Sequence, residues 1–269
     1  MRKLVYAIVA AVLMSSCAFA AEPRIAFLSR MNISEAEFRN MLQKANHVGK
    51  WRMLSGKHDT CNVRFYDSLT VMQMALNRNE VDEISLPEVV SEYLMKESSE
   101  YDISCITRTK ASMGLAFGFR QDNKALADKF NAALRDMKAD HTMAQIQGVY
   151  IHNKGKKSAA KFETFKGAET VKVAITGDLP PIDYVDEAGR PAGFNATLIS
   201  EIARRLRVNV KILNVEAGAR PSALASGRAD VVFWFETADD GSWPYDAPEG
   251  VLLSEPYYHW SKFLHLRLK

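Results

Sequence analysis

Long apolar runs are scarce in this sequence of 269 residues. The most apolar one, Leu4–Met14, is far shorter than the roughly 20 residues that a helix needs to cross a membrane. Arg2 and Lys3 precede it, and Ala18-Phe19-Ala20 supplies the small residues of a cleavage site. The pattern predicts a signal peptide over residues 1–20, cleaved near Ala20, and therefore a periplasmic or secreted protein.

Cysteine is also scarce, with three residues in the whole chain. Cys17 lies in the leader, where Met14-Ser15-Ser16-Cys17 allows a second interpretation as a lipobox, with Cys17 acylated and the protein a lipoprotein. Cys61 and Cys105 remain for the mature chain, in a compartment where disulfides form. Both lie in or beside strand-like segments, so a disulfide and two buried thiols are equally open.

An excess of one charge is missing as well, because 35 Lys and Arg stand against 32 Asp and Glu, a net charge of +3. No basic stripe indicates a nucleic-acid partner, and no His and Cys cluster has the spacing of metal ligands. We therefore expect no nucleic acid, metal or cofactor. The chain left after the leader, about 250 residues, is long enough for one large domain or two lobes with their own cores.

Strand-like and helical segments alternate along the chain, which is typical of an α/β fold with helices packed on a parallel sheet. Helical spacing of apolar residues is clearest around Leu126–Met137 and 195–206, and Ser34 with Glu37 forms a capping box. A polar, Lys-rich stretch at 152–168 reads as an exposed linker. Strands are expected at 24–28, 62–66, 84–86, 103–107, 113–120, 171–175, 208–213, 231–235 and 261–268.

One short sequence pattern occurs twice in the chain, and we call it the internal repeat. Residues 75–82 and 223–230 both have the form A-L-x-x-x-x-x-D, and each precedes an apolar strand, EISL or VVFW. The match is short, but the same order of strand and helix surrounds it. It indicates two α/β lobes of similar build, with a ligand between them at the carboxyl ends of the strands.

Several segments resemble the periplasmic solute-binding proteins of ABC importers, in particular the amino-acid-type family. Residues 171–213, VKVAITGDLPPIDYVDEAGRPAGFNATLISEIARRLRVNVKIL, are similar to the opening strand, Pro-Pro loop, hairpin and first helix of that family. PSALASGRADVVFWFET at 221–237, with LLSEPYY at 252–258, resembles its helix–Gly–Asp–strand and Ser-x-Pro-Tyr-Tyr segments. Residues 115–151 resemble its closing section, and RIAFL with EISLPEVVSEYL its second lobe. The resemblance implies a type II fold: two three-layer lobes with mixed, mostly parallel sheets.

The family order is permuted in this chain. The second-lobe-like unit comes first, at 21–110; a crossover strand and the closing helices follow at 111–151; and the first-lobe-like unit, at 170–269, comes after a linker at 152–169. We therefore expect Phe263–Leu268 to lie beside the strand at 114–119, with one covalent strand joining the lobes. The alternative is that two chains exchange strands.

On the first-lobe-like unit the resemblance implies contacts from Asp178, near a ligand ammonium, and from Thr237. Asp178 is equally well explained as a turn former. Tyr184 replaces an aromatic platform that Leu179 and Ile182 do not supply, or packs within the hairpin. Trp234 offers a platform for a flat or cationic ligand, or is a core residue. The family pattern is broken by Glu236 and by the absence of an Arg from 238–243, where Asp239, Asp240 and Trp243 stand. The acidic Glu236, Asp239 and Asp240, with the two Trp rings, favour a cationic or aromatic part of the ligand, or are solvated surface residues.

On the second-lobe-like unit, Ser29, Arg30 and Asn32 occupy the turn that donates N–H groups to an anion in the family. Arg30 and Arg220, the latter expected on a loop facing the cleft, are the candidates for replacing the missing Arg. Glu88 is a further candidate ligand, but Ser85-Leu86-Pro87-Glu88 also reads as a capping box, and this reading is favoured.

The function expected is the capture of a small polar solute, amino-acid-like or related, by a monomeric protein that delivers it to an ABC permease. The first alternative is a periplasmic enzyme on the same scaffold, such as a dehydratase or lyase, with Glu236 as general acid or base. No partner carboxylate, His or nucleophile is evident, so an enzyme is not expected. The second alternative is a module that senses a ligand for a membrane partner.

Overall fold

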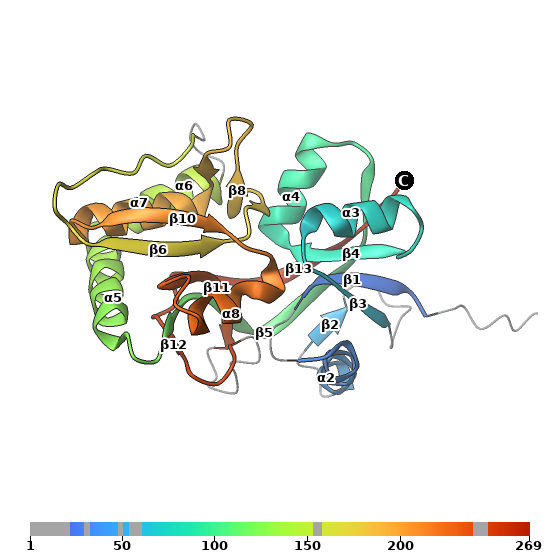
Figure 1. The fold of residues 1–269 in the computed structure, drawn as a ribbon. Coiled ribbons are helices and arrows are strands. Elements are labelled where there is room, and N and C mark those ends of the chain that lie inside the picture. Colours follow the sequence, from blue (N-terminus) through green and yellow to red (C-terminus); the bar gives the residue numbers. More distant parts are fainter. Residues whose placement is uncertain (1–21, 30–32, 48–50, 54–60, 153–157, 239–246) are drawn as a thin grey trace, which may run out of the picture.

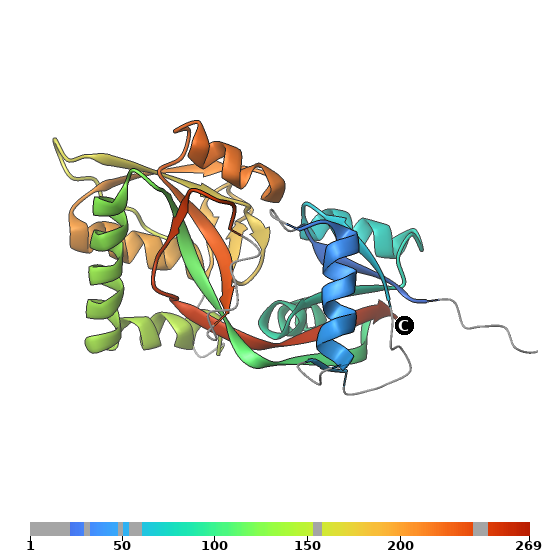
Figure 2. The same ribbon diagram turned by 90° about the horizontal axis from the view of Figure 1, so that it is seen from below.

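The computed structural model describes residues 22–29, 33–47, 51–53, 61–152, 158–238 and 247–269. Two α/β lobes stand side by side and are joined by two long strands (Figures 1 and 2). We call them the β1 lobe and the β6 lobe after their central strands. Hydrogen bonds join the strands of both lobes into one sheet, in the order β10 (Asn209–Asn214), β6 (Thr170–Ile175), β11 (Val231–Ala238), β5 (Tyr101–Arg120), β13 (Tyr258–Leu268), β4 (Glu83–Pro87), β1 (Arg24–Leu28) and β3 (Asn62–Tyr66).

In the β1 lobe, the strands β3, β1 and β4 are parallel, and helices connect them. Ser34 caps α2 as expected: its backbone N–H donates to Glu37 Oε2 at 2.8 Å, and Glu37 N–H donates back to Ser34 Oγ at 3.3 Å. The elements of this lobe are β1 (Arg24–Leu28), α2 (Glu35–His47), β2 (Trp51–Met53), β3 (Asn62–Tyr66), α3 (Leu69–Asn77), β4 (Glu83–Pro87) and α4 (Glu88–Glu97).

In the β6 lobe, the strands β10, β6 and β11 are again parallel. Helices α5 and α6 come from the middle of the chain and pack against α7, where Thr197 Oγ1 donates to Tyr150 OH at 3.0 Å. The elements are α5 (Lys124–Ala139), α6 (Thr142–Tyr150), β6 (Thr170–Ile175), β7 (Asp178–Leu179), β8 (Asp183–Val185), β9 (Pro191–Ala192), α7 (Phe194–Leu206), β10 (Asn209–Asn214), η1 (Ala217–Ala219), α8 (Arg220–Ala225), β11 (Val231–Ala238) and β12 (Val251–Leu253).

The two lobes are connected by β5 (Tyr101–Arg120) and β13 (Tyr258–Leu268), which run antiparallel to each other (Figure 2). The sequence predicted two strands at 103–107 and 113–120, but the structure has one strand of 20 residues. The register also differs from the prediction, because Leu264 pairs with Ile106 and Tyr258 with Leu115. The prediction of a single covalent connection was wrong, since both β5 and β13 pass from one lobe to the other.

The aspartates that end the internal repeat, Asp82 and Asp230, form equivalent hydrogen bonds in the two lobes. Asp82 N–H donates to Arg24 O at 2.8 Å, and Asp82 Oδ2 accepts from Arg24 N–H at 2.8 Å. Asp230 repeats both bonds with Lys172, each at 2.8 Å. In each lobe this aspartate therefore ties the start of the third strand to the start of the first. The strand orders β3-β1-β4 and β10-β6-β11 are equivalent, which confirms that the lobes have a similar build.

The core of the β6 lobe forms where α5 covers β5. The apolar face predicted for this helix is buried as expected, from Leu126 through Phe130 to Met137. Phe130 meets the ring of Phe117 edge-on at 5.6 Å, and Phe117 stacks on Tyr257 at 4.4 Å. Aromatic pairs of this kind add to the free energy gained from burying their surface.

Cys61 and Cys105 are both buried thiols, and no disulfide joins them. The expected leader at 1–20, including Cys17, lies outside the described residues. Within the described ranges, no helix is both long and apolar enough to span a bilayer.

Candidate functional site

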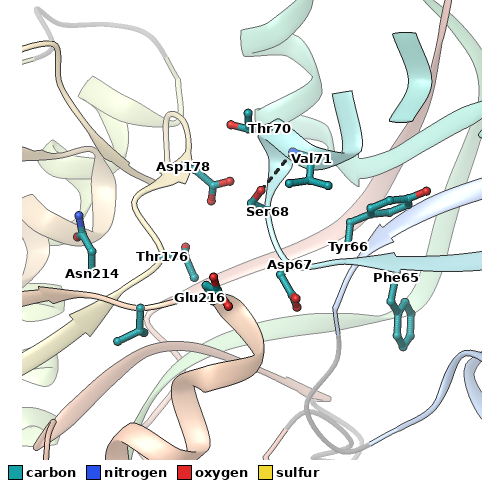
Figure 3. A pocket seen from close by; sticks show the side chains of 11 residues that line it. Phe65, Tyr66, Asp67, Ser68, Thr70, Val71, Thr176, Asp178, Asn214 and Glu216 are labelled. Carbon is teal, nitrogen blue, oxygen red and sulfur yellow. Dashed lines mark hydrogen bonds between the residues drawn. The ribbon is translucent and has the colours of Figure 1, made fainter. Parts of the chain in front are cut away.

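A pocket of about 610 Å³ lies between the two lobes, where strands β3, β6 and β10 end (Figure 3). This is the edge at which the sequence placed a ligand, because parallel strands present their carboxyl ends together. The pocket is lined from the β1 lobe by Phe65, Tyr66, Asp67, Ser68, Thr70 and Val71, and from the β6 lobe by Thr176, Asp178, Asn214, Val215 and Glu216.

The wall from the β1 lobe is the turn between β3 and α3. Ser68 is the N-cap of α3, and its Oγ accepts from the N–H of Val71 at 3.1 Å. Asp67 precedes it and is exposed in the pocket. Leu69 and Met72 of α3 are buried, and their packing fixes the direction of the helix. The first turn of α3 therefore points at the other lobe (Figure 3).

The wall from the β6 lobe begins directly after β6. Gly177 has a positive φ of 78°, and a side chain there would lie within 3.0 Å of Val185. The chain therefore turns sharply between Thr176 and Asp178, and both face the pocket. Asn214 and Glu216 reach the same space from the end of β10.

The Pro-Pro loop is held by the helix that follows it. Phe194 N–H donates to Pro181 O at 2.9 Å, and Asn195 N–H donates to Ile182 O at 2.8 Å, so the first turn of α7 is satisfied by the loop. Gly193 has φ 98°, and a Cβ there would lie 2.8 Å from the Pro181 and Ile182 oxygens. The Gly-Phe-Asn segment thus locks the loop that carries Asp178.

Asp178 joins the two lobes. Its Oδ2 accepts from the backbone N–H of Leu69, the first residue of α3, at 2.7 Å. The Thr70 N–H also contributes to the electrostatic environment of this carboxylate as a hydrogen-bond donor. Desolvation raises the pKa of Asp178, and these backbone donors oppose the rise.

Asp183 supports the same loop from the interior. It is buried, and its Oδ2 accepts from both the N–H and the hydroxyl of Thr176 at 3.0 Å. Desolvation raises the pKa of Asp183 to about 6, although the Thr176 donors act in the opposite direction. Asp183 therefore positions Thr176 in the pocket wall without lining the pocket itself.

The charge of the pocket lining is of one sign. Asp67, Asp178 and Glu216 carry carboxylates, and no Lys or Arg occurs among the lining residues that the structure describes. Phe65 and Tyr66 add aromatic surface on one side (Figure 3). Carboxylates together with aromatic rings suit a positively charged group better than an anion.

Of the residues predicted to bind a solute, Asp178 lines the pocket and three others are in the interior. Arg220 is the first residue of α8 instead of a loop residue, and it is buried. Its guanidinium donates to Phe233 O and Trp234 O and lies 5.0 Å from the Trp234 ring. Trp234 and Glu236 are likewise buried, which matches the interpretation of Trp234 as a core residue.

The other predicted residues that the structure describes do not line the pocket. Tyr184 pairs with Asp178 in the β7–β8 hairpin, and Thr237 Oγ1 donates to Gly114 O at 3.4 Å. Glu88 forms an ion pair with Lys262 of β13, and the predicted Ser85–Glu88 capping box does not form, since the N-cap is Pro87 and no side chain caps it. Ser29 N–H donates to Tyr66 O at 2.8 Å, beside the pocket. Arg30, Asn32, Asp239, Asp240 and Trp243 lie outside the described residues.

Most of the polar lining residues were not predicted from the sequence, among them Thr176, Asp67, Asn214 and Glu216. Each lies at or just after the end of a strand that was predicted to within one residue, at 62–66, 171–175 or 208–213. The signal was therefore present: polar residues within a few positions of the carboxyl end of a parallel strand face the crevice. The family pattern indicated Arg220 and Glu236 instead.

Comparison with known families agrees with the resemblance over part of the chain. Residues 171–239 match the model of "Bacterial extracellular solute-binding proteins, family 3". This segment contains Thr176, Asp178, Asn214 and Glu216, which form the wall of the pocket from the β6 lobe. No match was found among curated proteins.

Three solved structures illustrate the structural likeness. The ligand-binding component of an ABC-type import system from Staphylococcus aureus, with zinc bound, has 10% identity and a TM-score of 0.45 over 91% of this chain, which spans 65% of that protein. The BvgS VFT2 domain of Bordetella pertussis has 14% identity and a TM-score of 0.40 over 96% of this chain and 85% of its own. The alkanesulfonate-binding protein SsuA of Xanthomonas axonopodis pv. citri has 10% identity and a TM-score of 0.40 over 93% of this chain and 67% of its own.

Among the described residues, no group of three or more His, Cys, Asp or Glu is placed to hold a metal ion.

Proposed function

We propose that this protein is an extracytoplasmic solute-binding protein that captures a small polar solute between its lobes for import by an ABC permease. The observation that carries the proposal is the pocket of about 610 Å³ between the lobes. Its volume is in the range of small-molecule sites. The family match over 171–239 supports the same function.

The solute we propose is amino-acid-like or related to an amino acid, and it carries a positive charge. Asp67, Asp178 and Glu216 supply three carboxylates from both lobes, so a cation between them gains contacts from each side. Contacts from both lobes favour the closed state over the open one, so a bound solute adds to the stability of the closed state. The polar Asn214 and Thr176 add hydrogen-bonding groups for the rest of the solute.

A thermal-shift screen of the mature protein tests this proposal. The probes are arginine, lysine, putrescine and spermidine, with glutamate and succinate as matched anions. A solute that binds only the folded protein stabilises it by RT ln(1 + [L]/Kd), about 2.7 kcal/mol at a hundredfold excess over Kd. We expect at least one cationic probe to raise Tm and the anions to leave it unchanged. Chemical conversion of a bound probe would indicate an enzyme instead.

We also infer that the lobes are threaded in permuted order relative to the family. The β1 lobe precedes α5 and α6 in the chain, yet these helices pack on the β6 lobe, whose strands follow them. A recut chain tests this: it would begin at Ser158, pass from Lys269 through a short linker to Glu22, and end at His152. The same fold and the same solute preference are expected, and an unfolded recut chain would contradict the inference.

A further inference from the structure

The contact between Asp178 and α3 has a feature that solute binding does not require. The carboxylate belongs to the β6 lobe, and the helix that it caps belongs to the β1 lobe, 109 positions away in sequence. A hydrogen bond between residues of the two lobes favours the closed state over the open one whatever solute the pocket takes.

The geometry of this contact is that of a helix cap. Leu69 is the first residue of α3, and the first N–H groups of a helix have no partner within the helix. Ser68 Oγ satisfies the N–H of Val71, and Asp178 Oδ2 satisfies the N–H of Leu69 at 2.7 Å. The partial positive charge at the helix N-terminus adds to the attraction for a carboxylate. Asp178 therefore completes a cap that Ser68 leaves unfinished.

We infer that Asp178 is an interlobe clasp: it caps α3 of the opposite lobe and holds the cleft closed in the absence of a solute. Its position is fixed from behind, because Asp183 holds Thr176 and the positive φ of Gly177 sets the turn between them. The clasp goes beyond the proposed function, since it assigns the acceptor oxygen of Asp178 a role in closure, separate from the role of its charge in attracting a solute.

The charge of Asp178 and its acceptor oxygen have separable roles. Asp178→Asn keeps an oxygen that accepts from Leu69 N–H but removes the charge that attracts a cationic solute. Asp178→Ala removes both. The clasp therefore predicts that the asparagine variant stays closed and the alanine variant opens, whatever solute the pocket takes.

Double electron–electron resonance between spin labels on the two lobes measures this directly. Cysteines for labelling are placed at Glu80 and Lys211, both exposed, in a background with Cys61→Ala and Cys105→Ala. Without solute, we expect one short distance for the parent and for Asp178→Asn, and a longer, broader distribution for Asp178→Ala. Asp67→Ala is the matched control, because it removes a carboxylate from the same pocket and should keep the short distance.

A measurement on the unsubstituted chain keeps the inference testable if Asp178→Ala fails to fold. The amide proton of Leu69 should exchange slowly, and its NMR chemical shift should titrate together with the Asp178 carboxylate. The clasp is wrong if Asp178→Ala keeps the parental distance, if Asp67→Ala opens equally far, or if the Leu69 amide exchanges as fast as an exposed one. A failed solute screen leaves these readouts unaffected, so the two proposals fail separately.

Discussion

The guanidinium of Arg220 lies 5.0 Å from the ring of Trp234 and donates a hydrogen bond to the backbone oxygen of the same residue at 2.5 Å. Both residues were candidates for binding a solute, and in the fold they contact each other in the interior. Arg220 also donates to Ala217 O and Phe233 O, so it ties the start of α8 to the strand β11.

Arg220→Met should therefore lower the free energy of unfolding, by about 2–4 kcal/mol, because buried carbonyl oxygens lose a charged donor. Urea denaturation followed by circular dichroism measures the loss. Arg220→Lys is the control for charge, and it should recover part of the stability, since an ammonium cannot reproduce the planar fork. Normal stability of Arg220→Met combined with weaker solute binding would return Arg220 to the solute site.

Asp183 predicts a specific dependence of stability on pH. Burial raises the pKa of this carboxyl to about 6, so the folded state binds a proton more tightly than the unfolded chain does. Its contribution is therefore most favourable below about pH 4 and is lost as pH rises through about 6, by about 3 kcal/mol at most.

Asp183→Asn should remove that part of the pH dependence. The measurement is the free energy of unfolding of the parent and of Asp183→Asn between pH 4 and pH 7, taken as a difference so that other carboxyls cancel. The difference should shift in favour of the variant as pH rises. A difference that stays constant across this range would contradict the assignment.

Gly118 allows the ring of Phe235 to lie against the backbone of β5. A Cβ at Gly118 would stand 2.0 Å from Phe235 Cε2, which no rotation of a buried ring relieves cheaply. Gly118→Ala should destabilise the protein by about 1–3 kcal/mol through overpacking. Gly148→Ala is the matched control, because nothing lies within 4 Å of a Cβ there. Equal midpoints in urea for both variants would show that Phe235 does not pack as described.

The aspartates of the internal repeat should contribute alike to the stability of the two lobes. Asp82 and Asp230 each accept a hydrogen bond from the first strand of their lobe at 2.8 Å. Asp82→Ala and Asp230→Ala should each cost about 1 kcal/mol, the usual value of such a bond. The asparagine variants keep an acceptor oxygen and should cost less. Thermal unfolding measures all four, and a loss confined to one lobe would argue against an equivalent role.

Local patterns predicted most of the elements well. The strand 24–28 and the buried face of α5 follow from periodicity, and the structure confirms them. The continuous strand β5 was not predicted, because Arg108–Ser112 is polar and periodicity separates the apolar runs on either side. Arg108 in that segment pairs with Lys262 of β13 and with Arg52 of β2, and such pairing between distant parts of the chain cannot be recognised from local periodicity.

The site was less predictable than the fold. Asp178 was identified because it follows a strand within a recognisable loop, yet its partner Leu69 is 109 positions away and carries no polar side chain. Almost every residue has a backbone N–H, so the sequence does not indicate which of them will donate to Asp178. Arg220 shows the reverse case, since a charged residue beside a proline looked exposed but is needed inside.

Calorimetric titration of the probe that most stabilises the protein tests the central claim, that the acidic pocket between the lobes binds a small cation. The titration compares the parent with Glu216→Gln and Asp67→Asn, each of which removes one carboxylate from the lining, and with Glu163→Gln, an exposed carboxylate outside it. We predict a loss of affinity of about tenfold or more, on the order of 1.4 kcal/mol, for the two pocket variants and none for Glu163→Gln. Unchanged affinity in both pocket variants would contradict the account.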